Sequence, residues 1–253
     1  MFDNIPSETY GLYISYFGGG GVDNSSGGSD IDIIKQKLSR KSNYFIQGVE
    51  QSAPLEFELS VMSTQEITRD MLNSIQKWLF GQMGYKKLQI IQGDLSNVYF
   101  NCFLKSPDII AVGNVAYGLK FKVECDAPWG WERDANYAVG AVVTTKAVKY
   151  YNSSDDNHYI YPTLSFQKNG AGNLSIKNTT DNNNEIVFTG LQANDIIVVN
   201  NDLQIMTSTA GDNLLSKSNL KWFRLLNGYN DIVVTGNLTY LNIAHKVARK
   251  VGS

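Results

Sequence analysis

The alternation of apolar and polar side chains predicts a chain built mainly of β-strands. Between Leu55 and Val61 every second residue is apolar, and the residues between them are Glu56, Glu58 and Ser60. This period of two is typical of an antiparallel strand with one buried face and one solvent-exposed face. Apolar residues also alternate along four other segments of the first half, 10–16, 87–91, 97–104 and 117–125.

One segment of the first half follows a helical period instead. Its apolar side chains recur at steps of four, four, three and one, at Ile67, Met71, Ile75, Trp78 and Leu79. Such spacing places them in a single stripe along a helix of about four turns, which we expect to lie on a sheet. Ser63 and Glu66 have the spacing of a capping box before this helix, and Gly81 suits a left-handed cap after it.

The strand pattern breaks at Pro128, because proline lacks the N–H that a strand ladder needs. Trp129 and Trp131 follow at once, and two large aromatic residues at such a break favour a packed plug between domains over a ligand platform. We therefore expect an N-terminal α+β domain over 1–131, with antiparallel strands and one helix, and a second domain over 137–253.

The second half shows short strands and polar turns without a helical period, which is typical of an antiparallel β-sandwich. Asn200 and Asn201 between two apolar runs predict a tight hairpin. The expected strands lie at 137–143, 159–166, 174–176, 186–188, 196–199, 203–206, 220–226, 232–234 and 240–243.

Composition narrows the possible partners. The 253 residues include 22 basic and 24 acidic side chains, for a net charge of −2, and no Lys/Arg cluster. We therefore expect the protein not to bind nucleic acid or an anionic membrane through its charge, and to make only passive contact with DNA. No apolar run reaches the roughly 18–20 residues of a membrane helix, so we expect a soluble protein. Cys102 and Cys125 face the core by strand parity and are expected to stay thiols in a reducing cytosol.

Residues suited to catalysis or metal binding are scarce. The chain has only two histidines, His158 and His245, and no nucleophile, metalloprotease or CxxC motif. The four glycines of segment 18–21 open a Ser/Gly/Asn-rich stretch, which predicts a loop because it has too few apolar groups to pack. We do not interpret these glycines as a phosphate-binding loop, because no Lys-Ser/Thr pair follows them. Segments 155–157 and 181–185 lack the ligand spacing of a calcium loop and favour Asx-rich turns. We expect no catalytic residue, no cofactor and no metal.

A sugar-binding signature of galectins, WGxExR, has a partial counterpart at Trp129-Gly130-Trp131-Glu132-Arg133. Arg133 comes one residue early, and a one-residue slip in a strand turns a side chain to the opposite face. We therefore reject this segment as a lectin site.

Seven short motifs in a fixed order resemble the distal tail proteins of long non-contractile-tailed phages that infect Gram-positive bacteria. Each motif alone is weak, and their order carries the resemblance. They are Trp78-Leu79-Phe80, Tyr85-Lys86-Lys87-Leu88, Tyr99-Phe100-Asn101-Cys102, Cys125-Asp126-Ala127-Pro128-Trp129, Tyr161-Pro162-Thr163-Leu164-Ser165-Phe166, Leu174-Ser175-Ile176-Lys177-Asn178 and Leu225-Leu226-Asn227-Gly228-Tyr229-Asn230-Asp231-Ile232.

The resemblance implies a structural virion protein at the distal end of the phage tail, synthesised in the bacterial host cytoplasm. Its N-terminal domain would assemble six copies into a ring, and its C-terminal sandwich would be galectin-like and face outward. Such a hub joins the tail tube protein to the tail-tip protein, carries baseplate or receptor-binding proteins, and lets DNA pass through its channel.

Two other functions stay open. A carbohydrate-binding module of a host-recognition apparatus would suit the sandwich and its tyrosines, whereas a cell-wall hydrolase has almost no residue in its favour.

Overall fold

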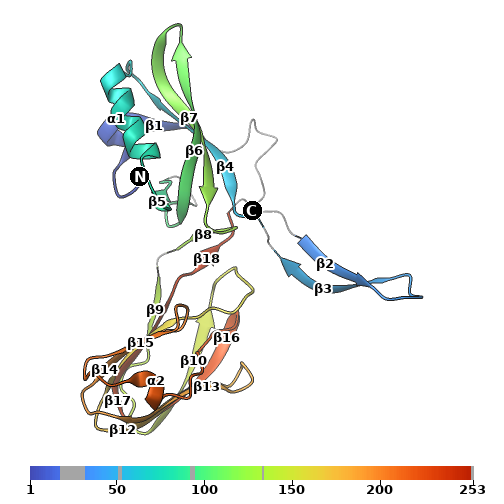
Figure 1. The fold of residues 1–253 in the computed structure, drawn as a ribbon, viewed down its shortest axis with the longest axis vertical. Coiled ribbons are helices and arrows are strands. Elements are labelled where there is room, and N and C mark those ends of the chain that lie inside the picture. Colours follow the sequence, from blue (N-terminus) through green and yellow to red (C-terminus); the bar gives the residue numbers. More distant parts are fainter. Residues whose placement is uncertain (18–31, 51–52, 92–94, 133, 252–253) are drawn as a thin grey trace. The chain divides into compact units, whose positions relative to one another are not determined.

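The computed structural model describes residues 1–17, 32–50, 53–91, 95–132 and 134–251. The chain divides into two compact units, Met1–Glu132 with Arg249–Ser253, and Arg133–Ala248. The chain is mainly β, as predicted, with one long helix among the described residues (Figure 1). The Gly/Ser-rich loop predicted after residue 17 lies outside the described residues.

The first unit is built on a seven-stranded sheet in the order β1-β4-β7-β6-β8-β18, with β5 also paired to β6. The pairings from β1 to β8, and that of β5, are antiparallel. The strands are β1 (Leu12–Phe17), β4 (Glu56–Ser63), β5 (Lys86–Gln89), β6 (Tyr99–Val112), β7 (Val115–Cys125), β8 (Gly130–Trp131) and β18 (Ala248–Arg249), and a short 3-10 helix, η1 (Ser7–Tyr10), precedes β1.

The end of the chain returns to the first unit, whereas the expected second domain extended to residue 253. Strand β18 adds to the edge of the first unit's sheet beside β8. Arg249 Nε lies 2.9 Å from a carboxylate oxygen of Glu132. This pairing joins residues more than a hundred positions apart, so no local pattern could predict it.

Strand β6 continues well beyond the predicted strand segment 97–104. Ser106, Pro107 and Asp108 lie inside β6, where the register with β7 shifts between Lys105 and Asp108. Ser106 has a positive φ of 55°. A β-bulge of this kind accommodates an extra residue and a proline without ending the strand, so the predicted end of the strand near residue 104 is wrong.

The predicted helix is present as α1 (Arg69–Phe80). Ile75 and Leu79 are buried and share one core with sheet residues that include Phe100 and Phe121. Trp78 packs against the same core, and its ring stacks on Tyr10 at 4.8 Å. Helix α1 therefore lies against the sheet (Figure 1), and its apolar stripe faces the shared core, as its period predicted.

Both predicted caps of α1 are wrong. The N-cap is Thr68, whose side chain accepts a hydrogen bond from the Met71 N–H at 3.4 Å. Ser63 lies at the end of β4 and accepts from the Gln65 N–H instead. Gly81 has φ −81°, outside the left-handed region, and its N–H donates to the Lys77 carbonyl. A helix start has several plausible capping residues, and packing selects one of them.

A two-stranded hairpin of β2 (Asp32–Lys37) and β3 (Tyr44–Glu50) lies in a segment where we predicted no strand. Among the described residues, β2 and β3 pair only with each other. Every described side chain of β2 is exposed. Neither strand alternates between buried and exposed positions, so the periodicity that revealed the other strands is missing.

The second unit consists of two antiparallel sheets around one core, which confirms the predicted sandwich. Inward-facing residues of both sheets alternate with outward polar ones, and Phe166 and Phe188 meet in the core at 5.8 Å. One sheet has the order β10 (Thr145–Asn152), β16 (Gly228–Thr235), β12 (Gly172–Asn178), β13 (Asn184–Leu191), and the other β15 (Ile205–Ser208), β14 (Ile196–Asn200), β11 (Thr163–Lys168), β17 (Leu238–His245), β9 (Ala135–Ala138).

The sequence analysis did not predict strand β10. Its buried positions are Tyr150 and Asn152, so one of the two inward side chains is polar and masks the alternation. The predicted strand at 220–226 is wrong, because this segment is irregular and makes only an isolated bridge from Leu225 to Ile160. A four-residue helix, α2 (Leu214–Lys217), precedes it.

The hairpin of β14 and β15 is present, but its loop is longer than the two asparagines that predicted it. Asn200 pairs with Ile205, so residues 201–204 form the loop. Asn201 is buried, donates to the Pro162 carbonyl and accepts from the Phe223 N–H at 2.8 Å. Its side chain thus ties the loop to two other segments, and a two-residue turn would not allow this.

None of the described helices is both long and apolar enough to cross a membrane.

Candidate functional site

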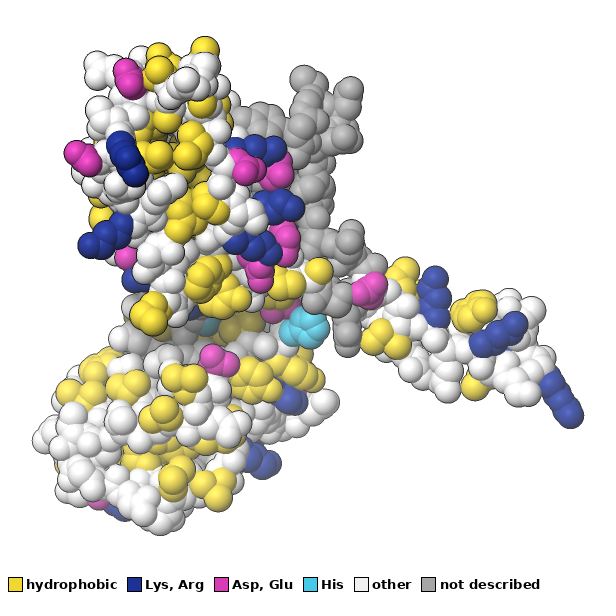
Figure 2. Space-filling view, turned by 45° about the horizontal axis from the view of Figure 1, so that its top comes forward, with side chains coloured by type: hydrophobic (Ala, Val, Ile, Leu, Met, Phe, Trp, Pro, Cys, Tyr) yellow, Lys and Arg dark blue, Asp and Glu magenta, His cyan; other side chains and the backbone are white. Residues whose placement is uncertain are grey.

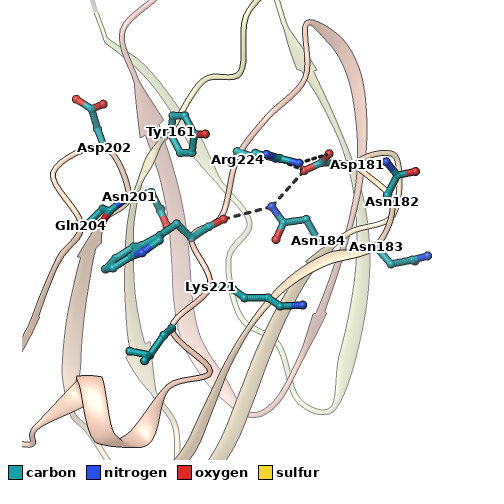
Figure 3. Close-up of a pocket in the computed structure, with 12 residues that line it drawn as sticks. Tyr161, Asp181, Asn182, Asn183, Asn184, Asn201, Asp202, Gln204, Lys221 and Arg224 are labelled. Atoms are coloured by element: carbon teal, nitrogen blue, oxygen red, sulfur yellow. Dashed lines mark hydrogen bonds and ion pairs between the residues drawn. The ribbon is translucent and has the colours of Figure 1, made fainter.

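A surface cavity of about 650 Å³ lies among four connecting segments of the second unit (Figure 3). These segments are the stretch before β11, the β12–β13 turn, the β14–β15 loop and the irregular stretch before β16. We call it the loop cavity, and its lining residues are Tyr161, Asp181, Asn182, Asn183, Asn184, Asn201, Asp202, Gln204, Leu220, Lys221, Trp222 and Arg224.

An ion pair holds one wall of the loop cavity. Asp181 is 2% exposed and accepts two hydrogen bonds from Arg224, at 2.7 and 3.1 Å. These bonds raise the pKa of Arg224 above its ordinary value. The guanidinium also lies 3.8 Å from the ring centre of Tyr159. Asn184 donates to Asp181 and to the Trp222 carbonyl, so the turn and the irregular stretch are joined (Figure 3).

The rim of the loop cavity carries side-chain amides that have no hydrogen-bond partner among the described residues. Asn182, Asn183 and Gln204 have positive φ angles of 48°, 57° and 57°. All three are exposed, and none of their side chains bonds to another described residue. The Asn184 N–H donates to the Asp181 carbonyl at 2.8 Å, which confirms the predicted Asx-rich turn. The rim therefore presents several neutral donors and acceptors to solvent.

The two histidines lie in different surroundings. His158 is exposed, and its Nδ1 lies 2.7 Å from a carboxylate oxygen of Asp156. His245 is buried, with Nε2 2.5 Å from the Tyr150 hydroxyl and Nδ1 2.8 Å from the Lys246 carbonyl. Across the described residues, no three His, Cys, Asp or Glu side chains gather in a way that could hold a metal ion.

Trp129 and Trp131 contact each other within the first unit, edge to face at 6.1 Å. The Trp131 indole N–H donates to a carboxylate oxygen of Asp126 at 3.2 Å. Their expected role as a plug between the domains stays a prediction. Arg133, which completed the partial galectin signature, lies outside the described residues.

The β2–β3 hairpin forms a second candidate surface. Large apolar side chains on it are 40–65% exposed, although such groups are normally buried. Figure 2 shows apolar and basic side chains along this hairpin. The apolar residues are Ile33, Ile34, Leu38, Tyr44, Phe45, Ile46 and Val49.

Two family models together match most of the chain. The model described as "Phage tail protein N-terminal domain" matches residues 1–127, and the model described as "Phage tail C-terminal domain" matches residues 129–245. Among curated proteins, no sequence matches the chain.

Solved phage structures share this fold. The Dit protein of phage SPP1, described as a paradigm of the hub adsorption apparatus in phages that infect Gram-positive bacteria, is 12% identical, with 97% of each chain covered and a TM-score of 0.72. A chain of the phage P2 baseplate in its activated conformation is 13% identical, with 96% of this chain and 91% of that chain covered and a TM-score of 0.52. The chain therefore belongs to the family of phage tail proteins that the two domain models describe, and it has the fold of the distal tail protein Dit.

Proposed function

We propose that this phage tail protein is a structural hub without enzymatic activity at the distal end of the tail. Six copies form a ring through their first units. The ring joins the tail tube protein to the tail-tip protein, and the galectin-like second units face outward and carry baseplate or receptor-binding proteins. The shared fold with the SPP1 Dit protein supports this proposal, since that protein is described as a hub of the adsorption apparatus.

The β2–β3 hairpin is the observation that carries the proposal. A two-stranded hairpin alone is marginally stable in water, and its outer edges leave backbone groups unpaired. This hairpin also exposes apolar side chains on both faces, because Phe45 and Ile46 are neighbours in β3 and point to opposite sides. A partner that covers it would bury these side chains and stabilise the hairpin.

Charge favours a second copy of the chain as that partner. Over residues 32–50 the hairpin has four basic side chains, Lys35, Lys37, Arg40 and Lys41, against two acids, Asp32 and Glu50. Since the whole chain has a net charge of −2, the rest of the chain carries an excess of acids that opposes this positive charge.

The first unit also offers an edge for such a contact. Strand β1 ends the seven-stranded sheet, and its Tyr13 and Ile14 are 55% and 39% exposed. A contact between the hairpin of one copy and the sheet edge of the next is head-to-tail, and contacts of this type close into rings when the rotation per subunit divides a full turn. Ring formation thus belongs to the first unit.

The proposal predicts a channel that passes DNA without binding it. A net charge of −2 and the lack of a long basic cluster in the sequence disfavour counterion-releasing contacts with phosphates. The scarcity of histidines and of nucleophile–base pairs likewise supports a role in assembly rather than in hydrolysis.

The test is the mass of the protein in solution, measured by light scattering, with electron microscopy of the same sample. We expect wild-type protein to have the mass of a hexamer and to appear as a ring. The double substitution Phe45→Ser and Ile46→Ser should shift the mass to a monomer, because it removes exposed apolar side chains from the hairpin without altering a core.

The matched control is Val143→Ser with Leu203→Ser, which removes apolar side chains that are 78% and 64% exposed in the second unit. This control should remain hexameric. A wild-type protein that stays monomeric at high concentration, alone and with its tail-tip partner, would contradict the hub. A hairpin variant that still forms hexamers would contradict the hairpin as the contact between copies.

A further inference from the structure

We propose that the loop cavity of the second unit is a binding site for a neutral glycan. This inference goes beyond the hub function and does not rest on it. The site lies in loops between the strands of one compact unit, and its volume of about 650 Å³ falls in the range of about 300–1,000 Å³ that is usual for small-ligand pockets.

The charges around the cavity disfavour an ionic ligand. Asp181 and Arg224 neutralise each other through two hydrogen bonds. Asp202 and Lys221 contribute one negative and one positive charge to the remaining lining. Because these charges offset each other, the cavity has no net charge that would select a phosphate, a carboxylate or a cation.

The free amides favour a ligand with many hydroxyl groups. Each of Asn182, Asn183 and Gln204 presents a carbonyl acceptor and two N–H donors, and none of these groups bonds to another described side chain. A sugar hydroxyl is a donor and an acceptor at once, so it can pair with both ends of such an amide. An apolar ligand would leave these amides without partners, at a cost in binding free energy.

Aromatic side chains complete the site. Tyr161, which is 39% exposed, and Trp222, which is partly buried, both line the cavity. A pyranose ring has an apolar face of C–H groups that packs on an aromatic ring, while its hydroxyls point outward to polar partners. Aromatic walls with a few polar groups are the usual composition of a specific small-ligand site.

The site is held in place before a ligand arrives. Asn184 links Asp181 to the Trp222 carbonyl, and Asn201 links the β14–β15 loop to Pro162 and Phe223. The two segments that carry the free amides, the β12–β13 turn and the β14–β15 loop, are therefore each tied to the irregular stretch before β16 by hydrogen bonds. Binding then requires little ordering of loops, which lowers its entropic cost.

The test is saturation-transfer NMR on the full-length protein, with signals observed on the sugar. The neutral probes are glucose, galactose, N-acetylglucosamine and the disaccharides maltose and chitobiose, and the anionic probe is polyglycerol phosphate. We expect transfer to at least one neutral probe and none to the anionic polymer.

Two variants test whether binding occurs in the loop cavity. Asn183→Gly with Gln204→Gly removes two amides but suits the positive φ angles of both positions, so the fold is preserved. Tyr161→Ala removes the exposed aromatic wall. Each should weaken binding of the responding sugar by about tenfold or more, the expected effect of losing two hydrogen bonds or one stacking contact.

The control is Tyr151→Ala, which removes a tyrosine that is 57% exposed on β10, outside the loop cavity. Binding by this variant should equal that of the wild type. The inference is overturned if no neutral probe shows transfer, if polyglycerol phosphate binds in their place, or if both cavity variants bind the sugar as the wild type does. A protein that stays monomeric but still binds the sugar would contradict the proposed hub and support the glycan site.

Discussion

At the residue scale, Cys102 and Cys125 lie opposite each other on β6 and β7, and both are fully buried. Burial raises the pKa of Cys102 to about 12 and shifts that of Cys125 upward as well. Since the thiolate is the reactive form, we expect iodoacetamide at about pH 8 to modify neither cysteine in the folded protein and both in guanidinium chloride.

Intact mass spectrometry measures this outcome. Freshly prepared protein should have the fully reduced mass. A mass lower by two hydrogens, or complete alkylation without denaturant, would show that these cysteines are not buried thiols.

His245 gives the second unit a predicted pH dependence. A carbonyl can only accept, so Nδ1 donates to the Lys246 carbonyl, and in the neutral ring Nε2 accepts from the Tyr150 hydroxyl. Burial lowers the pKa of His245 from its ordinary value of 6.5. The unfolded chain then binds a proton that the folded chain does not, so stability is greatest above about pH 6.5 and falls as the pH drops toward the folded pKa.

Thermal unfolding between about pH 8 and pH 5 measures this effect. In His245→Gln the amide can accept from Tyr150 and donate to Lys246 but does not titrate, so this variant should lose less stability over the same interval. Equal losses in both proteins would exclude His245 as the cause.

At the element scale, Gly81 ends α1 for a reason other than a left-handed backbone. A Cβ at this position would lie 2.4 Å from the Lys77 carbonyl oxygen, whose bond to the Gly81 N–H closes the helix. Gly81→Ala should therefore lower the free energy of unfolding of the first unit by about 1–3 kcal/mol, as other steric insertions do.

Gly84→Ala is the matched control, because a Cβ at Gly84 would meet no atom within 4 Å. Chemical denaturation of the two variants compares them directly. If the Gly81→Ala protein is as stable as the Gly84→Ala protein, the end of α1 rearranges around the added methyl group without loss of stability.

At the scale of the whole molecule, the second unit has its own core, formed by both of its sheets. We predict that residues 134–248 fold without the rest of the chain. Limited proteolysis should leave a stable C-terminal fragment of about this size, and the same fragment made alone should unfold cooperatively and stay monomeric. Uniform degradation, or a fragment without a cooperative transition, would contradict independent folding.

The sequence by itself determined those helices and strands whose apolar side chains recur with a regular period along the chain. A strand with one buried face alternates with period two, and a helix on a sheet shows a stripe with period 3.6, so β4, β7 and α1 were predictable from side-chain polarity alone. The parity of Cys102 and Cys125 placed both side chains in the core. The order of short motifs along the chain indicated the phage tail family, which two family models confirm.

Only the tertiary structure decided features that join distant or unpatterned segments. The pairing of β18 with the first sheet, the bulge within β6 and the choice of Thr68 as N-cap depend on contacts that no local period encodes. The β2–β3 hairpin buries neither face, so it lacks the alternation that marks a strand. The loop cavity gathers residues from four connecting segments, and their convergence follows from how the two sheets fold together, not from the spacing of residues along the chain.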